Sequence, residues 1–494
     1  MKKPSVDNND QSSTHTETYI EREPQRGDER EPLGDASGVE LVVNVAGTID
    51  ALIEKEVIKL AAQCRLFKDE THAEDELAVF RRNEVLTGEF LGNGAFSEVH
   101  QVWGFQLTNF GSRDPKQERA RLELCSTTYD QNGESSYVLK HLRRDLHHRG
   151  ANKFMHAAGD LVMEAKFLAY FDHQNIIKLH AWSGPTTSYH GNTHDACFLV
   201  LDRLDLTLSH KMIQWQMNLQ ASEAVYSPNL CDYAEKLNIG KQIATGLEYL
   251  HSRDIIFRDL KPDNIGFRGN TVQLFDFGLC RELPEAKPIE EKTFHMSGVG
   301  TKRYMAPEVF LGKHYNLKAD VYSWTIVFQS MLSLQKPFDM FDACHYKDLV
   351  CEQGARPPIF EEWPQGIQDL CRNGWAQDPH DRFTISEVRE EIEKIQAQIP
   401  TKGQHEYLVE MTDGEQMPFV IERSSSFDQS SIEDMMDNIC SPHRICLRIQ
   451  GVEPPKGGKS FLRMIEGQMM RASAPYERHV TSYPNLKHLR SQYL

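Results

Sequence analysis

The chain has 494 residues, of which 39% are hydrophobic and 26% charged, and this length allows more than one lobe with a buried core. Its 72 acidic residues exceed its 55 lysines and arginines and give a formal charge of -17. Because phosphate backbones bind to basic faces, this balance excludes nucleic acid as an expected partner. No apolar run in the sequence approaches the roughly 20 residues of a membrane-spanning helix, so we expect no membrane span.

The ten cysteines are scattered along the chain and form no CxxC pair. This usage is typical of reduced thiols in an intracellular protein. The first residues also lack the apolar core of a signal peptide. We therefore expect a cytoplasmic, possibly nuclear, protein.

Both ends of the chain differ in composition from its middle. Residues 1–40 are polar and acidic and cannot bury enough surface to offset their chain entropy, so we expect a disordered segment. In the segment 41–83 apolar residues recur at helical spacing, which predicts a helical leader that packs on the neighbouring lobe or binds a partner. Residues 398–494 are turn-rich and are expected to form a tail or an accessory region.

The middle of the chain changes from a strand pattern to a helix pattern. Short runs typical of β-strands occur between 84 and 142, and a polar stretch at 109–136 resembles a long hairpin insertion. Helical periodicity dominates afterwards, as in 234–251. Strands followed by helices predict an α+β fold of two lobes, a small sheet lobe at 84–201 and a larger helical lobe at 205–397.

A turn with two glycines between strand-like runs is the first candidate for chemistry. Glycine lets backbone N–H groups approach phosphate oxygens without side-chain obstruction. A Gly-X-Gly hairpin is common by itself, and Ser97 stands where a third glycine would complete the pattern. The candidate residues of this turn and its flanking strands are Leu91, Gly92, Asn93, Gly94, Ala95, Phe96, Ser97 and Val99.

A lysine and a carboxylate form the second candidate. Lys140 closes the strand-like run that contains Val138. It is either a solvated edge charge or a point charge that holds phosphates and is fixed by a carboxylate partner. Glu164, in a helical stretch 24 residues later, is the candidate partner.

The third candidate is a loop followed by an Asp-Phe-Gly run. Asp259, Lys261 and Asn264 lie in a loop that contains a proline, and Asp276 comes 12 residues after Asn264. Mg²⁺ prefers oxygen ligands, which Asn264 and Asp276 supply. Asp259 then remains to orient or deprotonate an attacking hydroxyl.

These motifs together resemble the eukaryotic protein-kinase family over residues 84–397. The similarity continues with Gly-Thr-Lys-Arg-Tyr-Met-Ala-Pro-Glu at 300–308, then Asp320, then Arg382. Each motif alone is weak, but all occur in the family's order. The resemblance implies the bilobal kinase fold, with a small β-rich N-lobe and a larger helical C-lobe, and use of Mg²⁺ and ATP.

The resemblance also implies a role for each matching residue. Lys140, paired with Glu164, would hold the α- and β-phosphates of ATP, while Lys261 would contact the γ-phosphate. Asp259 would position the substrate hydroxyl and accept its proton. Asn264 and Asp276 would bind Mg²⁺. The backbone of Asp202 and Leu204 would bond the adenine, and the glycine turn would cover the phosphates, with Val138 also expected at the ATP site.

Three positions depart from the family pattern. Ser97 replaces the third glycine, Phe257 replaces a histidine, and Gly266 stands where the family has a larger residue under the adenine. The missing contact at Gly266 would lower ATP affinity. Because the phosphate, metal and proton-handling groups are all present, an active kinase is favoured, and a pseudokinase acting as a nucleotide-binding scaffold is the alternative.

Two further features concern the substrate and its control. Lys261 and Thr301 resemble the serine/threonine branch, and parts of the helical lobe resemble its tyrosine-kinase-like group. Arg258 and Arg281 would pair with a phosphate on the activation segment, placed by an upstream kinase. Ser297 is the candidate phosphosite and Thr293 the second candidate; the alternative is that Ser297 is an ordinary loop serine.

Overall fold

The computed structural model describes residues 64–67, 77–107, 114–184, 195, 197–221, 233–284, 291–398, 404–411, 416–422 and 446–450. The chain divides into two compact units, Met1–Gln396 and Ala397–Leu494. The expected disordered segment 1–40 lies outside the described residues. In the second unit, three described strands form an antiparallel sheet in the order β13-β12-β14, with β12 at Gln404–Met411, β13 at Gln416–Glu422 and β14 at Cys446–Gln450.

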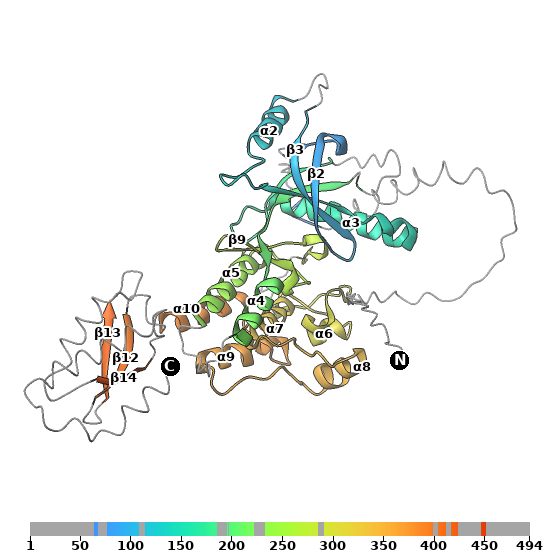
Figure 1. The fold of residues 1–494 in the computed structure, drawn as a ribbon. Coiled ribbons are helices and arrows are strands. Elements are labelled where there is room, and N and C mark those ends of the chain that lie inside the picture. The colour runs from blue at the N-terminus through green and yellow to red at the C-terminus, as the bar shows by residue number, and fades with distance from the viewer. Residues whose placement is uncertain are drawn as a thin grey trace, which may run out of the picture. The chain divides into compact units, whose positions relative to one another are not determined.

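The first unit begins with a six-stranded sheet in the order β1-β5-β6-β4-β3-β2 (Figure 1). Its strands pair antiparallel, except β1 and β5, which are parallel. The strands are β1 (Ala78–Val79), β2 (Val85–Asn93), β3 (Ser97–Phe105), β4 (Tyr137–Leu142), β5 (Leu179–Trp182) and β6 (Phe198–Asp202). All six residues of β4 are buried, which places this central strand between two covered faces of the lobe.

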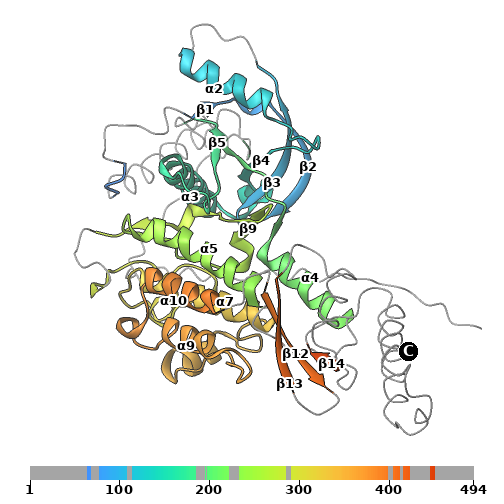
Figure 2. The same ribbon diagram turned by 90° about the vertical axis from the view of Figure 1, so that its left-hand side faces the viewer.

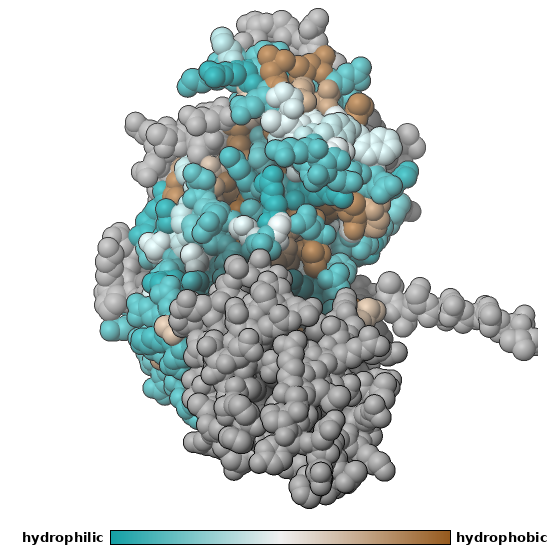
Figure 3. Space-filling model, turned by 60° about the vertical axis from the view of Figure 1, so that its left-hand side comes forward, coloured by the Kyte–Doolittle hydropathy of each residue, from teal (hydrophilic) through white to brown (hydrophobic). Residues whose placement is uncertain are grey.

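Among the described residues, two helices accompany the sheet: α2 (Pro115–Ser126) lies at the end away from the helical lobe, and α3 (Ala151–Tyr170) lies next to that lobe (Figures 1 and 2). A buried apolar cluster joins α2 to the strands through Leu124, Phe80, Leu139 and Val200. On the face seen in Figure 3, hydrophobic side chains of this lobe form separate small groups between hydrophilic ones. Scattered exposure of this kind is ordinary for a folded domain.

The helical lobe surrounds a buried helix, α7, which contacts both α5 and α9. Every residue of α7 except its last, Ser333, is buried, so this helix is the centre of the lobe's core. The helices are α4 (Leu208–Ala221), α5 (Ala234–His251), α6 (Pro307–Phe310), α7 (Lys318–Ser333), α8 (Ala343–His345), α9 (Gln365–Gly374) and α10 (Ile385–Ala397).

Short strands and single turns connect these helices. The strands are β7 (Leu206–Thr207), β8 (Ile255–Ile256), β9 (Ile265–Arg268), β10 (Thr271–Leu274) and β11 (Arg281–Glu282). The 3-10 turns across both lobes are η2 (Arg82–Glu84), η3 (Arg144–Arg149), η5 (Pro262–Asn264), η6 (Phe277–Leu279), η8 (Lys302–Tyr304) and η10 (Pro379–Asp381), and a π-helix, η9, spans Tyr346–Glu352. The strands β8 and β11 pair antiparallel, with Arg281 opposite Ile256 and Glu282 opposite Ile255.

A buried ion pair holds the helical lobe together. The guanidinium of Arg382 donates to both carboxylate oxygens of Glu308, at 2.6 and 2.8 Å. Bidentate geometry satisfies both charges in the interior, and removal of one partner would leave the other unpaired. Substitution of either residue is therefore expected to destabilise this lobe.

The sheet begins before residue 84, where the lobe was expected to start. Ala78 and Val79 form β1 beside β5, and Arg82–Glu84 form a 3-10 turn. The described parts of the expected leader, 64–67 and 77–83, therefore contain no α-helix. A short strand binds to the edge of a sheet through backbone hydrogen bonds. Because the backbone makes these bonds, the spacing of apolar side chains in the sequence does not predict them.

The stretch expected as a hairpin insertion contains a helix instead. Asp114 accepts a hydrogen bond from the N–H of Lys116, and Pro115 occupies the first turn of α2. Arg121 of this helix is buried and pairs with the buried Glu84 at 2.8 Å. The Asp-Pro pair is a helix-start signal, but the polar composition of the stretch favoured a loop.

Candidate active site

Lys140 lies at the centre of a three-residue charge cluster. Its Nζ is 2.7 Å from Oε2 of Glu164 and 2.8 Å from Oδ1 of Asp276. Lys140 lies on β4 and Glu164 on α3, while Asp276 immediately precedes η6. Glu164 also accepts a hydrogen bond from the backbone N–H of Phe277. A strand, a helix and the Asp-Phe-Gly turn thus meet at one ammonium group, as the sequence predicts for Lys140 and Glu164.

Lys140 and Asp276 stabilise each other's charges, whereas burial and the nearby Asp276 raise the pKa of Glu164 despite Lys140. Burial alone would lower the pKa of Lys140, but the carboxylates of Asp276 and Glu164 raise it above its usual value. Burial of the Asp276 carboxylate would likewise raise its pKa. The positive charge of Lys140, with a smaller contribution from Lys261, instead holds the pKa of Asp276 below its usual value. The site therefore contains a fixed ammonium and a fixed carboxylate across the neutral pH range.

The catalytic-loop candidates form a second network around Asp259. Lys261 Nζ donates to Oδ2 of Asp259 at 2.9 Å, and Asn264 Nδ2 donates to the same oxygen at 3.1 Å. Thr301 donates to Oδ1 through its N–H and its hydroxyl, both at 2.8 Å. Four donors thus fix the orientation of the Asp259 carboxylate.

The backbone before Asp259 is held in an uncommon conformation. Arg258 has a φ of 73° and Asp276 has a φ of 70°, values that L-residues adopt only when the surroundings compensate the strain. Asp320 on α7 supplies part of that compensation, because its carboxylate accepts the N–H groups of Phe257 and Arg258 at 2.8 and 2.9 Å. The buried helix α7 therefore positions the loop that carries Asp259.

Asn264 lies beside the residue that precedes Asp276, because the N–H of Phe275 donates to the carbonyl of Asn264 at 3.1 Å. The amide nitrogen of Asn264 bonds to Asp259, which leaves its amide oxygen as the group able to bind a cation. The Asp276 side chain is 43% exposed. An amide oxygen and a carboxylate are the hard donors that Mg²⁺ prefers, so the residues fit the metal that the resemblance implies.

The glycine turn joins β2 to β3. Strand β2 ends with Leu91, Gly92 and Asn93, and β3 begins at Ser97 and includes Val99. The turn between the strands consists of Gly94, Ala95 and Phe96. The turn closes with a 2.8 Å hydrogen bond from the N–H of Gly94 to the carbonyl of Ser97. A Cβ built on Gly92 would contact nothing, and one on Gly94 would meet the Ser97 hydroxyl, so the backbone at Gly92 is open to approach.

The strands place Val99 and Val138 on the same face as Lys140. Val99 pairs directly with Lys140 across β3 and β4, and Val138 precedes Lys140 by two residues on β4. Residues at these spacings share a face of a sheet. Both valines therefore line the side of the sheet that carries the lysine.

Asp202 and Leu204 connect the two lobes. The N–H of Asp202 donates to the carbonyl of Lys178, and its buried carboxylate accepts hydrogen bonds from His180 and Arg268, each at 2.8 Å. Burial would raise the pKa of Asp202, but His180 and Arg268 hold it below its usual value. This side chain thus fixes the connection, and its adenine-binding role remains a prediction for the backbone.

A protein kinase domain model matches residues 125–392 of the chain, more than half of its length. The chain belongs to the protein kinase family. The two-lobed fold and the order of the motifs agree with this assignment, and the expectation drawn from the resemblance is confirmed.

Curated relatives of this kinase are similar over part of the chain. A mitogen-activated protein kinase kinase kinase 7 of Drosophila melanogaster is 30% identical over 234 residues, 46% of this chain and 31% of the relative. The human protein of the same name is 27% identical over 233 residues, 46% of this chain and 34% of the relative. A probable serine/threonine-protein kinase of Dictyostelium discoideum is 32% identical over 189 residues, 37% of this chain and 13% of the relative. The match thus spans about a third or less of each relative.

Phe257 of this kinase fills the position where the family has a histidine. Its ring lies 5.2 Å from that of Phe277, and the ring of Phe277 lies 5.5 Å from that of Phe171 at the end of α3. Phe257 and Phe277 are fully buried. The substitution therefore keeps a packed aromatic contact between the catalytic loop and the Asp-Phe-Gly turn.

The residues expected to control this kinase meet beside the catalytic loop. Arg258 Nη1 lies 3.4 Å from the Ser297 hydroxyl. Burial and the neighbouring Arg258 lower the pKa of Arg281 to about 10, because a nearby like charge disfavours the charged form. Asp160 of α3 also faces both arginines, and burial raises its pKa to about 6 despite them. Asp160 was not among the site residues predicted from the sequence.

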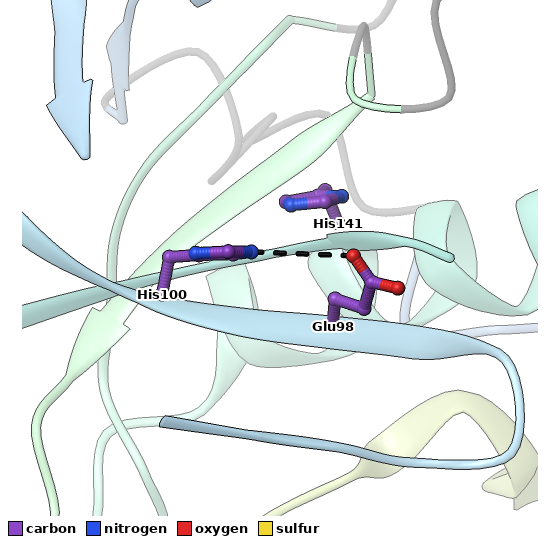
Figure 4. A group of neighbouring side chains, drawn as sticks. All are labelled: Glu98, His100 and His141. Atoms are coloured by element: carbon purple, nitrogen blue, oxygen red, sulfur yellow. Dashed lines mark ion pairs between the residues drawn. The ribbon is translucent and has the colours of Figure 1, made fainter. Parts of the chain in front are cut away.

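A further group of possible metal ligands lies elsewhere on the sheet. Glu98 and His100 of β3 and His141 of β4 bring their ligand atoms within 4.8 Å of one another (Figure 4). The two imidazole rings are stacked at 5.2 Å with an interplanar angle of 11°. Nitrogen lone pairs lie in the ring plane, so parallel rings do not aim them at a single point. The group is a cross-strand polar cluster in this conformation, not a preformed metal centre.

In the described part of the chain, no helix is both long and apolar enough to cross a membrane.

Proposed function

We propose that this protein transfers the γ-phosphate of Mg-ATP to serine or threonine hydroxyls of protein substrates. The proposal depends on two contact networks that occur together. In the first, Lys140 contacts the carboxylates of Glu164 and Asp276. In the second, the Asp259 carboxylate accepts hydrogen bonds from Lys261, Asn264 and Thr301. Phosphoryl transfer needs positioned charges more than covalent chemistry. A pseudokinase scaffold would not need both networks.

In this proposal each group has one task. Lys140, held by Glu164, binds the α- and β-phosphates, and the open backbone at Gly92 covers them. Asp259 accepts a hydrogen bond from the substrate hydroxyl and takes its proton as the new P–O bond forms and the bond to ADP breaks. Lys261 neutralises charge on the transferred phosphoryl group.

Asn264 and Asp276 would hold Mg²⁺ through an amide oxygen and a carboxylate oxygen. When bound, the ion neutralises charge on the phosphate oxygens and fixes their geometry. Because Asp276 already contacts Lys140 at 2.8 Å, the lysine and the metal ligand act on neighbouring parts of the same triphosphate.

Serine and threonine specificity is supported by Lys261 and Thr301, which bond to each other at 3.2 Å as well as to Asp259. We also propose activation by an upstream kinase that phosphorylates Ser297, whose hydroxyl lies 3.4 Å from Arg258 Nη1, with Arg281 as the second arginine expected to bind the phosphate. A cytoplasmic or nuclear location and the absence of a nucleic-acid partner belong to the same proposal. The -17 charge of the chain supports the latter.

The proposal is tested by transfer of ³²P from the γ-position of Mg-ATP to a degenerate Ser/Thr/Tyr peptide library. Incorporation on serine and threonine that disappears in Asp259→Asn protein is the expected result. Incorporation on tyrosine as well would revise the residue class, since one relative is named a dual specificity protein kinase. ATP binding without any incorporation, in protein phosphorylated at Ser297, would favour the pseudokinase alternative.

A further inference from the structure

A short segment before the kinase sheet, Cys64–Phe67, binds to the helical lobe. Arg65 Nε donates to Glu282 at 2.9 Å, and its Nη2 donates to Asp254 at 2.8 Å and to the Leu283 carbonyl at 3.2 Å. The backbone N–H groups of Arg65 and Leu66 also donate to Glu282. One carboxylate thus binds three N–H donors of this segment and also the thiol of Cys64.

The partners of Arg65 lie at two functional junctions. Asp254 directly precedes β8, which leads into the catalytic loop, and Glu282 ends β11, which follows the Asp-Phe-Gly turn. The pairing of β8 with β11 places Glu282 opposite Ile255, and the N–H of Leu283 donates to the Asp254 carbonyl at 2.8 Å. Arg65 therefore connects the base of the catalytic loop to the start of the activation segment.

The other end of the segment packs on α3. The ring of Phe67 lies 5.1 Å from that of Phe167 and 5.5 Å from that of Tyr170, and Lys166 Nζ lies 5.7 Å from its centre. These three residues belong to the helix that carries Glu164. The segment consequently touches the sheet lobe through Phe67 and the helical lobe through Arg65.

An aromatic chain continues from this contact into the active site. Phe167 stacks on Phe171 at 5.9 Å, and Phe171 contacts Phe277 at 5.5 Å. Phe277 in turn donates its N–H to Glu164. Packed aromatic contacts transmit displacement because interiors leave little free volume.

Burial distinguishes this contact from an ordinary surface ion pair. The side chain of Glu282 is 7% exposed and Cys64 is 4% exposed, whereas the side chain of Arg65 is 36% exposed. Loss of the Arg65 side chain would remove the Nε donor from the buried carboxylate of Glu282, which costs more than the loss of an exposed pair.

We propose that Cys64–Phe67 is an intramolecular clamp that holds α3 in the position where Glu164 pairs with Lys140. Arg65 and Phe67 are positioning residues that act through α3, and they contact neither substrate nor nucleotide. This proposal rests on the proposed kinase function for its rate measurements. It does not need that function for its structural test, which is hydrogen exchange.

The structural test uses the full chain without nucleotide. Arg65→Ala and Phe67→Ala should each speed amide exchange in peptides covering Ala151–Tyr170 by about threefold or more, because a helix that has lost its packing opens more often. Arg65→Lys keeps one ionic contact and should fall between Arg65→Ala and wild type. The control is Arg372→Ala, which breaks the exposed pair of Arg372 with Asp369 on α9. Unchanged exchange in α3 for both clamp variants would overturn the proposal.

The kinetic test asks whether the clamp acts through Glu164. Arg65→Ala should lower kcat about tenfold as the competent population falls, with a smaller effect on KM for the peptide. In a Glu164→Gln background, Arg65→Ala should not lower kcat further. If Arg65→Ala instead caused an independent structural defect, its effect on kcat would add to that of Glu164→Gln. Full additivity overturns the proposal. An inactive wild-type protein would refute the proposed function alone, and hydrogen exchange would still decide on the clamp.

Discussion

The side chain of Leu204 fills the space beside Gly266. A Cβ built on Gly266 would stand 2.3 Å from Cδ1 of Leu204 and 3.2 Å from its Cγ. Gly266 was expected to leave a gap under the adenine, and the leucine from the connection between the lobes occupies that volume. The exchange keeps an apolar side chain at this place, but that side chain comes from the connection between β6 and β7 and not from β9.

A pair of substitutions tests this exchange. Gly266→Leu should lower the thermal unfolding midpoint by a few degrees and raise KM for ATP, because overpacking of this kind costs about 1–3 kcal/mol. Leu204→Ala combined with Gly266→Leu should recover most of both losses. The measurements are differential scanning fluorimetry and initial rates over an ATP titration. A double variant as impaired as Gly266→Leu would show that the two side chains do not share one volume.

Thr301 holds the catalytic carboxylate with two donors, its N–H and its hydroxyl. Thr301→Val removes only the hydroxyl, and it should lower kcat about 10- to 100-fold with little change in KM for ATP, since the loss affects the orientation of Asp259. Thr301→Ser should retain activity near wild type.

The matched control for Thr301 is Thr245→Val, because the Thr245 hydroxyl bonds only to a carbonyl one turn earlier in α5 among the contacts described. Steady-state kinetics on one peptide substrate compare the variants. If Thr301→Val and Thr245→Val lower kcat equally, Thr301 does not orient Asp259.

Ser297 lies 3.4 Å from Arg258, and Tyr315 donates its hydroxyl to the Ser297 carbonyl at 2.7 Å. A phosphate on Ser297 would relieve the repulsion between Arg258 and Arg281 and order the segment. Ser297→Ala should therefore lower kcat at least about tenfold relative to phosphorylated wild type. Thr293→Ala, four residues before Ser297, should leave kcat unchanged.

The phosphorylation state of Ser297 is verified by mass spectrometry before the rates are compared. An unchanged rate for Ser297→Ala, beside a wild-type sample shown to carry the phosphate, would reduce Ser297 to an ordinary loop serine.

The site was predictable from sequence because its chemistry is local to short motifs. The loop that contains Asp259, Lys261 and Asn264 supplies its own network, and Lys140 meets Glu164 because a strand and the next helix pack together. Residue type and spacing determine such contacts. The order of strands and helices likewise predicted the two lobes.

The parts that escaped prediction depend on contacts between distant segments. Arg65 meets Glu282 across 217 positions, and no periodicity in either segment indicates this pair. Leu204 fills the space beside Gly266 through tertiary packing alone. The helix that carries Arg121 was missed for a different reason. Its start signal at Asp114 is present in the sequence, but the polar composition of the stretch favoured a loop in the prediction.

Asp160 gives the fold a pH dependence of defined sign. Burial raises its pKa to about 6, while Arg281 and Arg258 oppose the shift. An aspartate in the unfolded chain has a pKa of about 3.9. Between these values the folded state binds more protons than the unfolded state, so this group's contribution to stability falls as pH rises from about 4 to 6 and is constant above.

Asp160→Asn should remove that contribution. The measured quantity is the free energy of unfolding of wild type minus that of Asp160→Asn at the same pH. This difference should fall by about 1–3 kcal/mol between pH 4 and pH 7, which corresponds to a change of roughly two units in the pKa of Asp160 on folding. Urea unfolding at four pH values measures the difference, with Asp369→Asn, an exposed carboxylate on α9, as the control. Because the subtraction cancels every other titrating group, parallel curves for wild type and Asp160→Asn would mean that Asp160 is ionised throughout this range and that Arg281 and Arg258 outweigh its burial.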